Sequence, residues 1–387
     1  MPVAKRTQVV LVRGEGCRVW DEDGKSYLDM VGGWATNTLG HCSPVITDAL
    51  TEQAGTLVHT SNQFYTVPQL ELADLLIKNS PFDRVFFANS GVEANEGAVK
   101  LARKYGQHRR NGAYTVITTD HSFHGRSLAM LTATGKEAYK LDYGPLPTGF
   151  LNVPFNDLDA IKAATDDLTA AIMLEPVQGE GGVNMADAAY LKGVREWCDQ
   201  NNLLLIFDEV QTGVGRLGKL WGHQVYGVEP DVMTLAKGLG GGVPIGAILA
   251  KESCSIFTYG DHGSTFGGNP LATAVGLAVM REVINKDIPG HVATVGSYFQ
   301  NKLKALQAQR PYITDVRGAG LLIGVEFDSD IAGQVAAGAL SKGMLLNTPA
   351  ANIVRFMPPL VMTEAEVDEV VSILAQVLDE VKSPAAV

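Results

Sequence analysis

The chain has 387 residues, of which 46% are hydrophobic and 42 are glycines, a composition typical of a large globular α/β protein with many turns. Its formal net charge of −11 argues against general binding to nucleic acids or to anionic membranes. No apolar run is long enough to span a bilayer, the N-terminal segment lacks a signal-peptide core, and the 4 cysteines show no CxxC pairing. We therefore expect a soluble, cytoplasmic protein with free thiols.

The N-terminal residues predict short strands at 8–12 and 17–20, followed by the tight turn DEDGK. A helical pattern follows at 43–57. These elements are too few to enclose a core of their own. We expect them to belong to a small domain that the C-terminal part of the chain completes.

A larger domain begins near residue 60, with a helix at 68–78 and a strand at 84–87. That strand turns through Ser90 and Gly91 into a helix, and Ser90 and Glu93 have the spacing of a capping box. Unpaired backbone N–H groups and the positive end of the helix dipole would make this turn a phosphate site. An ordinary helix cap is the simpler alternative.

The strand at 114–118 leads into the sequence DHSFHGR. His121 and His124 have an i, i+3 spacing, but no third ligand with convincing spacing appears, so we expect no metal site. Phe123 would by default be a core residue and Arg126 a surface cation.

Acidic residues follow two strands that read as buried on both faces. Residues 171–174 lead into EPVQGEGG, and after a helix at 187–200 the run 203–207 ends in Asp208 and Glu209. Ligands in α/β sheets lie beyond the carboxyl ends of the strands, so Asp208 is a candidate partner for a cationic ligand group. Lys237, between an apolar segment and GLGGG, is placed to be desolvated and nucleophilic. An acid for a ring nitrogen and an amine for a covalent link are what pyridoxal 5'-phosphate (PLP) needs from its protein.

The sequence GVGRLG at 213–218 formally matches the GxGxxG pattern of dinucleotide-binding proteins. Its context is poor, because several residues separate it from the preceding strand and no convincing crossover helix follows. We interpret it as a glycine-rich turn.

The remaining chain predicts a strand at 245–250, a loop at 262–270, helices at 293–309, 332–342 and 364–381, and strands at 318–327 and 353–357. Arg355 lies inside the last of these strands. A charge is unusual there unless it meets an anion.

FDEVQTGVGRLG followed by LAKGLGGGVPIGA resembles the class III, fold-type I aminotransferases, and within them the acetylornithine aminotransferases. The similarity runs from GEGCRVWDEDGKSYLD near the start to VRFMPPL near the end. It implies an α/β fold with a large PLP-binding domain at 60–275, built on a mostly parallel, seven-stranded sheet flanked by helices. A smaller α+β domain would combine residues 1–59 with 276–387.

The resemblance also implies roles for individual residues. Lys237 would be the catalytic lysine, and Asp208 would keep the pyridine nitrogen protonated. Gln211 would contact the ring hydroxyl, with Phe123 and Val210 on opposite faces of the ring. Ser90, Gly91 and Val92 would bind the phosphate, together with Thr265 of the neighbouring subunit in a homodimer. The expected substrate-binding residues are Arg126, Glu180, Ser264 and Arg355, with Glu180 as a gate that pairs with Arg355 or swings away from it.

The implied reaction converts N2-acetylornithine and 2-oxoglutarate into N-acetylglutamate 5-semialdehyde and glutamate, a step in arginine synthesis. Succinyl-diaminopimelate, ornithine and 4-aminobutyrate aminotransferases share the motifs and remain alternatives. A PLP aminomutase and a non-catalytic PLP-binding protein are more distant ones. The sequence GGWATNT at 32–38 departs from the more aliphatic pattern of many members, so Trp34 and Asn37 leave the acyl-group preference open.

Overall fold

A computed structural model describes residues 1–3 and 6–382. Its centre is a seven-stranded sheet with the strand order β4-β12-β11-β10-β7-β5-β6. The pairings of β10 with β11 and β7, and of β5 with β7 and β6, are parallel, whereas β12 runs antiparallel to both neighbours. This arrangement confirms the predicted α/β class. The strands are β4 (Arg84–Ala88), β5 (Thr115–Thr119), β6 (Phe150–Val153), β7 (Thr169–Leu174), β10 (Leu204–Asp208), β11 (Val232–Leu235) and β12 (Gly246–Ala250).

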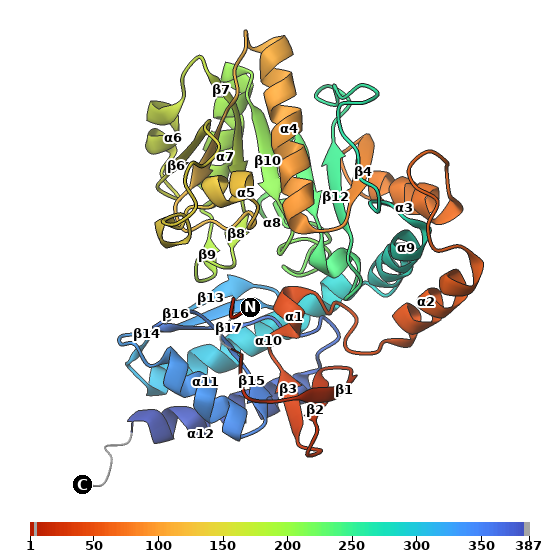
Figure 1. Cartoon of the computed structure of the whole chain (residues 1–387). Helices are drawn as coiled ribbons and strands as arrows, with labels where there is room; N and C mark the ends of the chain where they lie inside the picture. Colours follow the sequence, from red (N-terminus) through yellow and green to blue (C-terminus); the bar gives the residue numbers. More distant parts are fainter. Residues whose placement is uncertain (4–5, 383–387) are drawn as a thin grey trace.

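Helices cover both faces of this sheet, which explains its continuous apolar strands (Figure 1). Successive residues of β10 point to opposite faces. Leu204 and Ile206 pack with residues of α4, whereas Leu205 and Phe207 pack with residues of α7. The helices of this part are α4 (Gly91–Arg109), α5 (Leu128–Ala133), α6 (Leu158–Ala164), α7 (Ala188–Asn201) and α8 (His223–Tyr226).

The N-terminal and C-terminal segments of the chain lie side by side below this sheet in Figure 1. β3 pairs in parallel with β15, so the N-terminal strands join the C-terminal part of the chain. One four-stranded sheet has the order β1-β2-β3-β15 and the other β13-β14-β17-β16. Their strands are β1 (Leu11–Glu15), β2 (Arg18–Asp21), β3 (Ser26–Asp29), β13 (Ile313–Ala319), β14 (Leu322–Phe327), β15 (Met344–Leu345), β16 (Asn347–Ala350) and β17 (Ile353–Phe356).

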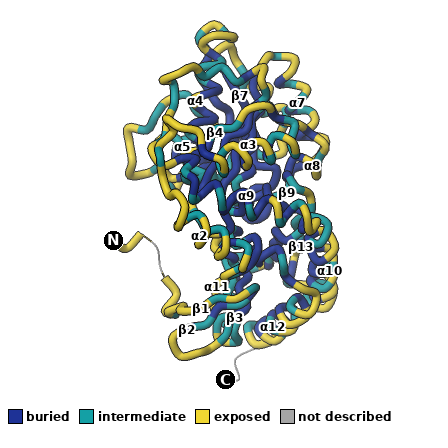
Figure 2. Tube along the Cα trace, turned by 90° about the vertical axis from the view of Figure 1, so that its right-hand side faces the viewer, coloured by how far each residue is buried: buried dark blue, intermediate teal, exposed yellow. Residues whose placement is uncertain are grey.

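Long helices pack around these sheets and beside the central one. Figure 2 shows that α9 is largely buried, whereas much of α2 is exposed. The helices are α1 (Gly32–Ala35), α2 (Pro44–Thr56), α3 (Val67–Lys78), α9 (Pro270–Asn285), α10 (Ile288–Gln309), α11 (Ala332–Ser341) and α12 (Glu364–Lys382), and a two-stranded hairpin is formed by β8 (Val177–Gln178) and β9 (Asn184–Met185). Within the described residues, no helix is long and apolar enough to cross a membrane. The domain boundaries at residues 59 and 275 stay a prediction.

Some strands and helices begin at other residues than the sequence predicts. The first strand begins at Leu11 rather than at residue 8, because β1 pairs only with β2 and its apolar side chains are exposed. Helix α10 begins at Ile288 rather than at residue 293, and its N-cap Asp287 accepts a hydrogen bond from the N–H of Gly290. The N-cap Asp287 and Pro289 in the first turn mark the start of this helix in the sequence, whereas the apolar periodicity alone places the start later.

Candidate active site

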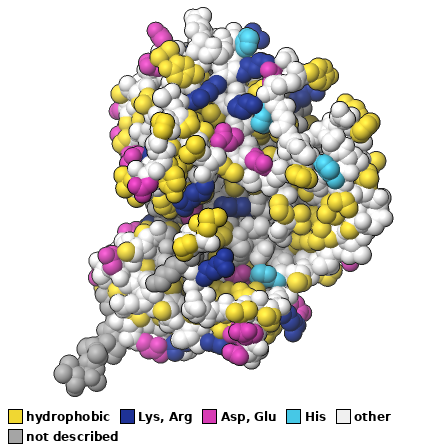
Figure 3. Space-filling view, in the orientation of Figure 1, with side chains coloured by type: hydrophobic (Ala, Val, Ile, Leu, Met, Phe, Trp, Pro, Cys, Tyr) yellow, Lys and Arg dark blue, Asp and Glu magenta, His cyan; other side chains and the backbone are white. Residues whose placement is uncertain are grey.

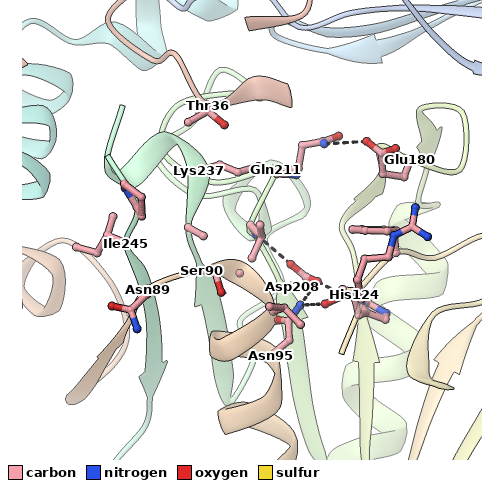
Figure 4. Close-up of a pocket in the computed structure, with 18 of the residues that line it drawn as sticks. Thr36, Asn89, Ser90, Asn95, His124, Glu180, Asp208, Gln211, Lys237 and Ile245 are labelled. Atoms are coloured by element: carbon pink, nitrogen blue, oxygen red, sulfur yellow. Dashed lines mark hydrogen bonds and ion pairs between the residues drawn. The ribbon is translucent and has the colours of Figure 1, made fainter. Parts of the chain in front are cut away.

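A cavity of about 430 Å³ lies beyond the carboxyl ends of β7 and β10 (Figure 4). This is the edge of the sheet where an α/β fold offers a ligand site. Most residues predicted for the site line the cavity. They are Ser90, Gly91, Val92, Phe123, Arg126, Glu180, Asp208, Val210, Gln211 and Lys237.

Asp208 ends β10 and is almost fully buried, with 4% of its surface exposed. Its Oδ2 accepts a hydrogen bond from Asn95 Nδ2 at 2.7 Å and lies 2.9 Å from His124 Nδ1. Its Oδ1 accepts from the N–H of Val210 at 3.0 Å. His124 Nε2 has no partner among the described residues. The Asp208 carboxyl group is thus held by an amide, an imidazole and a backbone N–H, and it lines the cavity where a cationic ligand group could meet it.

The start of α4 has the geometry of an anion site. The N-cap Ser90 accepts a hydrogen bond from the N–H of Glu93, while the carboxylate of Glu93 accepts from the N–H of Asn89. The N–H groups of Gly91 and Val92, in the first turn, have no acceptor within the helix. A Cβ at Gly91 would lie 2.7 Å from Val210 Cγ1, so only glycine lets the helix start approach β10 this closely.

Lys237 begins a short 3-10 helix at Lys237–Leu239, directly after β11. Its φ of 42° is in the left-handed region, which a non-glycine residue adopts only when the surrounding structure holds it there. Burial lowers the pKa of the Lys237 ammonium, although the nearby Glu180 and Asp208 act in the opposite direction. The predicted desolvation of this lysine is therefore present in the structure.

Phe123 and Arg126 come from the loop after β5. The guanidinium carbon of Arg126 lies 5.4 Å from the centre of the Phe123 ring and 4.0 Å from that of Tyr139. Arg126 is exposed at the cavity wall. The two rings hold the alkyl stem and guanidinium of Arg126 against the cavity while its N–H groups stay accessible to an anion.

Glu180 and Arg355 form an ion pair with 2.7 Å between Oε1 and Nη2. Arg355 is fully buried in β17, and its Nε donates to Asn347 Oδ1 at 2.9 Å. Gln211 bridges the pair, because its Oε1 accepts from Arg355 Nη1 and its Nε2 donates to Glu180. Figure 4 shows the contact between Gln211 and Glu180. Burial opposes ionisation of Glu180, but Arg355 and Lys237 outweigh it, so the pKa of the Glu180 carboxyl is lowered. Burial lowers the pKa of the Arg355 guanidinium, whereas Glu180 acts in the opposite direction.

Three predicted residues are absent from the lining of this cavity: Arg355, which pairs with Glu180, and Ser264 and Thr265. Ser264 accepts hydrogen bonds from Asn89 Nδ2 and from the N–H of Gly267, which places it beside the turn between β4 and α4. Thr265 is exposed on the same loop. The chain therefore does not bring its own Thr265 to its own cavity.

The two alternative motifs have structural explanations. Residues 213–218 form consecutive turns in which Gly215 and Gly218 have positive φ, which confirms the interpretation of GVGRLG as a glycine-rich turn. His121 is exposed, whereas His124 is buried against Asp208, so the two histidines do not converge.

Sequence reasoning missed several polar residues that complete the site. Asn95 was read only as part of a helix, yet it links Asp208 to Thr234 Oγ1, which donates to Asn95 Oδ1 at 2.7 Å. A polar residue on the small-residue face of α4 was the available signal. Glu175, directly after β7, was recognised only as one of the acids at a strand end. Its Oε2 accepts from the N–H of Phe123 at 3.0 Å.

Glu175 is the most strongly perturbed acid of the cavity. Burial and then the nearby charge of Asp208 raise the pKa of the Glu175 carboxyl well above its usual range. The Glu175 carboxyl therefore keeps its proton to a higher pH than an ordinary glutamate does. The contact with the Phe123 N–H needs only an acceptor oxygen, which an amide also supplies.

Glu175→Gln should therefore stabilise the protein at high pH and leave its stability unchanged at low pH. A folded-state pKa above the unfolded one means that the folded state binds more protons, so wild-type stability falls as pH rises from about 4.3 through the raised pKa. Each unit of upward shift corresponds to about 1.4 kcal/mol, which the glutamine variant would not lose. Thermal unfolding at pH 5 and pH 8 measures the effect, with the exposed Glu137→Gln as a control. An equal difference at both pH values would contradict a neutral Glu175.

Comparison with known proteins agrees with this geometry. The family model described as aminotransferase class-III matches residues 2–378. The acetylornithine aminotransferase of Caldanaerobacter subterraneus subsp. tengcongensis is 52% identical over 383 residues, covering 99% of this chain and 98% of that protein. The structure of N-acetylornithine aminotransferase from Stenotrophomonas maltophilia K279a is 39% identical with a TM-score of 0.84, covering 97% of this chain and 96% of that chain. That of the ornithine aminotransferase from Toxoplasma gondii, described with partial occupancy of PLP at its active site, is 33% identical with a TM-score of 0.95, covering 99% and 93%. This chain belongs to the class-III aminotransferase family.

Proposed function

We propose that this protein transfers the terminal amino group of N2-acetylornithine to 2-oxoglutarate, giving N-acetylglutamate 5-semialdehyde and glutamate in arginine synthesis. The observation that carries the proposal is a cavity lined by Lys237, Asp208 and Glu180, with Arg355 paired to Glu180 at its edge. Relatives similar over nearly the whole chain are acetylornithine aminotransferases. A cytoplasmic location stays a prediction.

The residues of the cavity fit pyridoxal phosphate. The free N–H groups at the start of α4 suit its phosphate, the buried Asp208 carboxylate suits its ring nitrogen, and Phe123 and Val210 offer apolar walls for its ring. Ser90, Gly91, Val92, Gln211 and Lys237 would complete its binding site. When bound, this group withdraws electrons from the substrate carbon that carries the amino group.

Lys237 would carry the cofactor through Nζ and then move protons. Burial lowers the pKa of its ammonium, so the amine reaches its uncharged form more readily than a surface lysine does. An uncharged Nζ can accept the proton from the substrate carbon and return it in the next step. Asn95 and His124 keep the Asp208 carboxylate in place, so it can hold a proton on the ring nitrogen.

The Glu180–Arg355 pair would let one cavity accept two different substrates. While the pair is closed, the charge of Arg355 is neutralised and Arg126 binds the single free carboxylate of N2-acetylornithine. 2-Oxoglutarate has two carboxylates. It would displace Glu180 and place one carboxylate on each arginine. Opening the gate exchanges one carboxylate for another on Arg355, which limits its cost.

Trp34 lies beside Arg355, where it bears on the acyl group. Its ring centre lies 5.7 Å from the guanidinium carbon of Arg355, and half of the residue is exposed. It is held in a left-handed turn, since Gly32, Gly33, Trp34 and Ala35 all have φ between 55° and 64°. An indole beside the gate would restrict the size of the acyl group that fits there.

A homodimer would complete the site. Thr265 lies on an exposed loop, and exposed apolar residues adjoin it on the side of the molecule with α2 and α3 (Figure 3). They include Leu57, Val58, Phe64, Tyr65, Val67 and Phe266. Such a patch is larger than isolated surface hydrophobics and favours burial against a second copy. Thr265 of each chain would then approach the phosphate in the other cavity.

Protein supplied with PLP and 2-oxoglutarate should form glutamate from N2-acetylornithine with a kcat/KM at least about tenfold higher than from ornithine or 4-aminobutyrate. The reason is that the acyl amide of N2-acetylornithine is neutral. It therefore needs no oppositely charged side chain beside the closed Glu180–Arg355 pair. Steady-state glutamate formation measures the ranking, and Lys237→Ala should form none. Succinyl-diaminopimelate tests the acyl preference. A preference for ornithine or 4-aminobutyrate would overturn the substrate assignment.

Phe266→Asp should convert the protein to a monomer and remove most of its activity, because a buried charge at the interface is costly and Thr265 would be lost from the partner's cavity. Sedimentation velocity and glutamate formation are the readouts. Leu168→Asp, which is exposed between α6 and β7, should remain dimeric and active. A monomeric but fully active Phe266→Asp variant would refute a shared site.

A further inference from the structure

Glu180, the proposed gate, lies in the short loop between β8 and β9, and this loop is attached at its backbone to two cations. Lys136 Nζ donates to the carbonyl of Glu180 itself at 2.6 Å. Arg317 donates from Nε to the carbonyls of Gly182 and Val183, both at 3.1 Å, and from Nη2 to Gly182 at 2.7 Å. Arg317 belongs to β13, so it holds the loop from the C-terminal part of the chain, which lies directly below the hairpin (Figure 1).

Arg317 is in register with Arg355 across the sheet. Arg317 pairs with Gly324 on β14, Gly324 pairs with Arg355 on β17, and Arg355 pairs with Asn347 on β16. Directly opposite residues of antiparallel strands point to the same face. The sheet therefore presents two guanidinium groups to one loop. One meets the Glu180 side chain and the other meets the backbone two and three residues further on.

The glycine between the two arginines makes room for the loop. A Cβ at Gly324 would lie 3.1 Å from Val183 Cβ, and Val183 is fully buried. Val183 has a φ of 59°, which is unusual for a β-branched residue, and Gly182 has a φ of 117°. Such a backbone persists only when its surroundings hold it, and the three bonds from Arg317 do so.

Arg317 is not suited to bind a substrate anion. Its Nη1 already pairs with Asp315 and Glu326, and only 18% of its side chain is exposed. Its charge is thus neutralised within its own sheet. Its remaining N–H groups are directed to the loop carbonyls.

We propose that Arg317 is a positioning residue for substrate exchange: it fixes the backbone of the Glu180 loop, so that only the Glu180 side chain moves when the gate opens. This inference rests on the gating role given to Glu180 in the proposed function. Without Arg317 the loop can withdraw from β14 and β17, and the Glu180 carboxylate no longer reaches Arg355 reliably. The closed gate, which the amine substrate requires, is then lost more readily than the open one.

The test compares two properties of the holoenzyme. The first is the rate at which N2-acetylornithine alone bleaches the visible band of the bound cofactor, which requires the closed gate. The second is the Kd of glutarate, a non-reacting dicarboxylate, from its perturbation of the same band. Arg317→Met should lower the second-order rate constant of bleaching by N2-acetylornithine about tenfold, while the Kd of glutarate stays equal or falls. A merely structural arginine would weaken both together.

Further variants separate the possible outcomes. Arg317→Lys can reach one carbonyl and should show a smaller shift in the same direction, which serves if Arg317→Met fails to fold. Asp315 contacts Arg317 but not the loop. Asp315→Asn should therefore leave unchanged the ratio of the bleaching rate constant to the Kd of glutarate. In a Glu180→Ala background, Arg317→Met should have no further effect on that ratio.

Two results would overturn the inference in different ways. If Glu180→Ala changes this ratio but Arg317→Met and Arg317→Lys do not, Arg317 has only a structural role. The gating role of Glu180 is then retained. If Glu180→Ala itself leaves the ratio unchanged, the gate of the proposed function is wrong, and the role of Arg317 falls with it.

Discussion

The structure depends on one buried carboxylate, Asp208, at the end of the central strand β10. An unpaired charge at this depth would cost several kcal/mol, about as much as the stability of many domains. The protein lowers that cost with an amide from α4, an imidazole from the loop after β5, and a backbone N–H. These contacts fix the start of α4 and the Phe123 loop relative to β10. The start of α4, the side chains of Phe123 and Val210, and Lys237 therefore lie around this one carboxyl group.

The proposed function sets the second constraint, because two substrates with different charges would use one cavity. Arg126 is mounted between two rings at the wall, whereas Arg355 is buried and neutralised by Glu180. The sheet that carries Arg355 also holds the backbone of the Glu180 loop through Arg317. The part of the chain that combines the N-terminal and C-terminal segments therefore carries both Arg355 and the contacts to the Glu180 loop. In the proposed function, these contacts decide when Arg355 can bind an anion.

The sequence was sufficient for the elements whose chemistry is local. Apolar runs that end in acids predicted the central strands and the position of Asp208, and a desolvated Lys237 followed from its apolar surroundings. Contacts between distant segments were not predictable in this way. Asn95 meets Asp208 across 113 residues. Its place among small residues of α4 marks a packed face, but it does not show that this face meets the end of β10. His124 was considered as a metal ligand, although it serves a carboxylate. Arg317 was overlooked because its partners are carbonyl groups, which leave no mark in a sequence.

The most direct test of the central claim is to find which amine carries the cofactor. Holoprotein prepared with pyridoxal phosphate is treated with borohydride, which fixes the cofactor to the amine that holds it, and the modified peptide is mapped by mass spectrometry. Unbound cofactor is removed before reduction. The account predicts one stoichiometrically modified residue, Lys237, and no such selective modification in Lys237→Ala or in protein denatured before the cofactor is added. Modification of another lysine in native protein, or no stable modification at all, would contradict the assignment of this cavity.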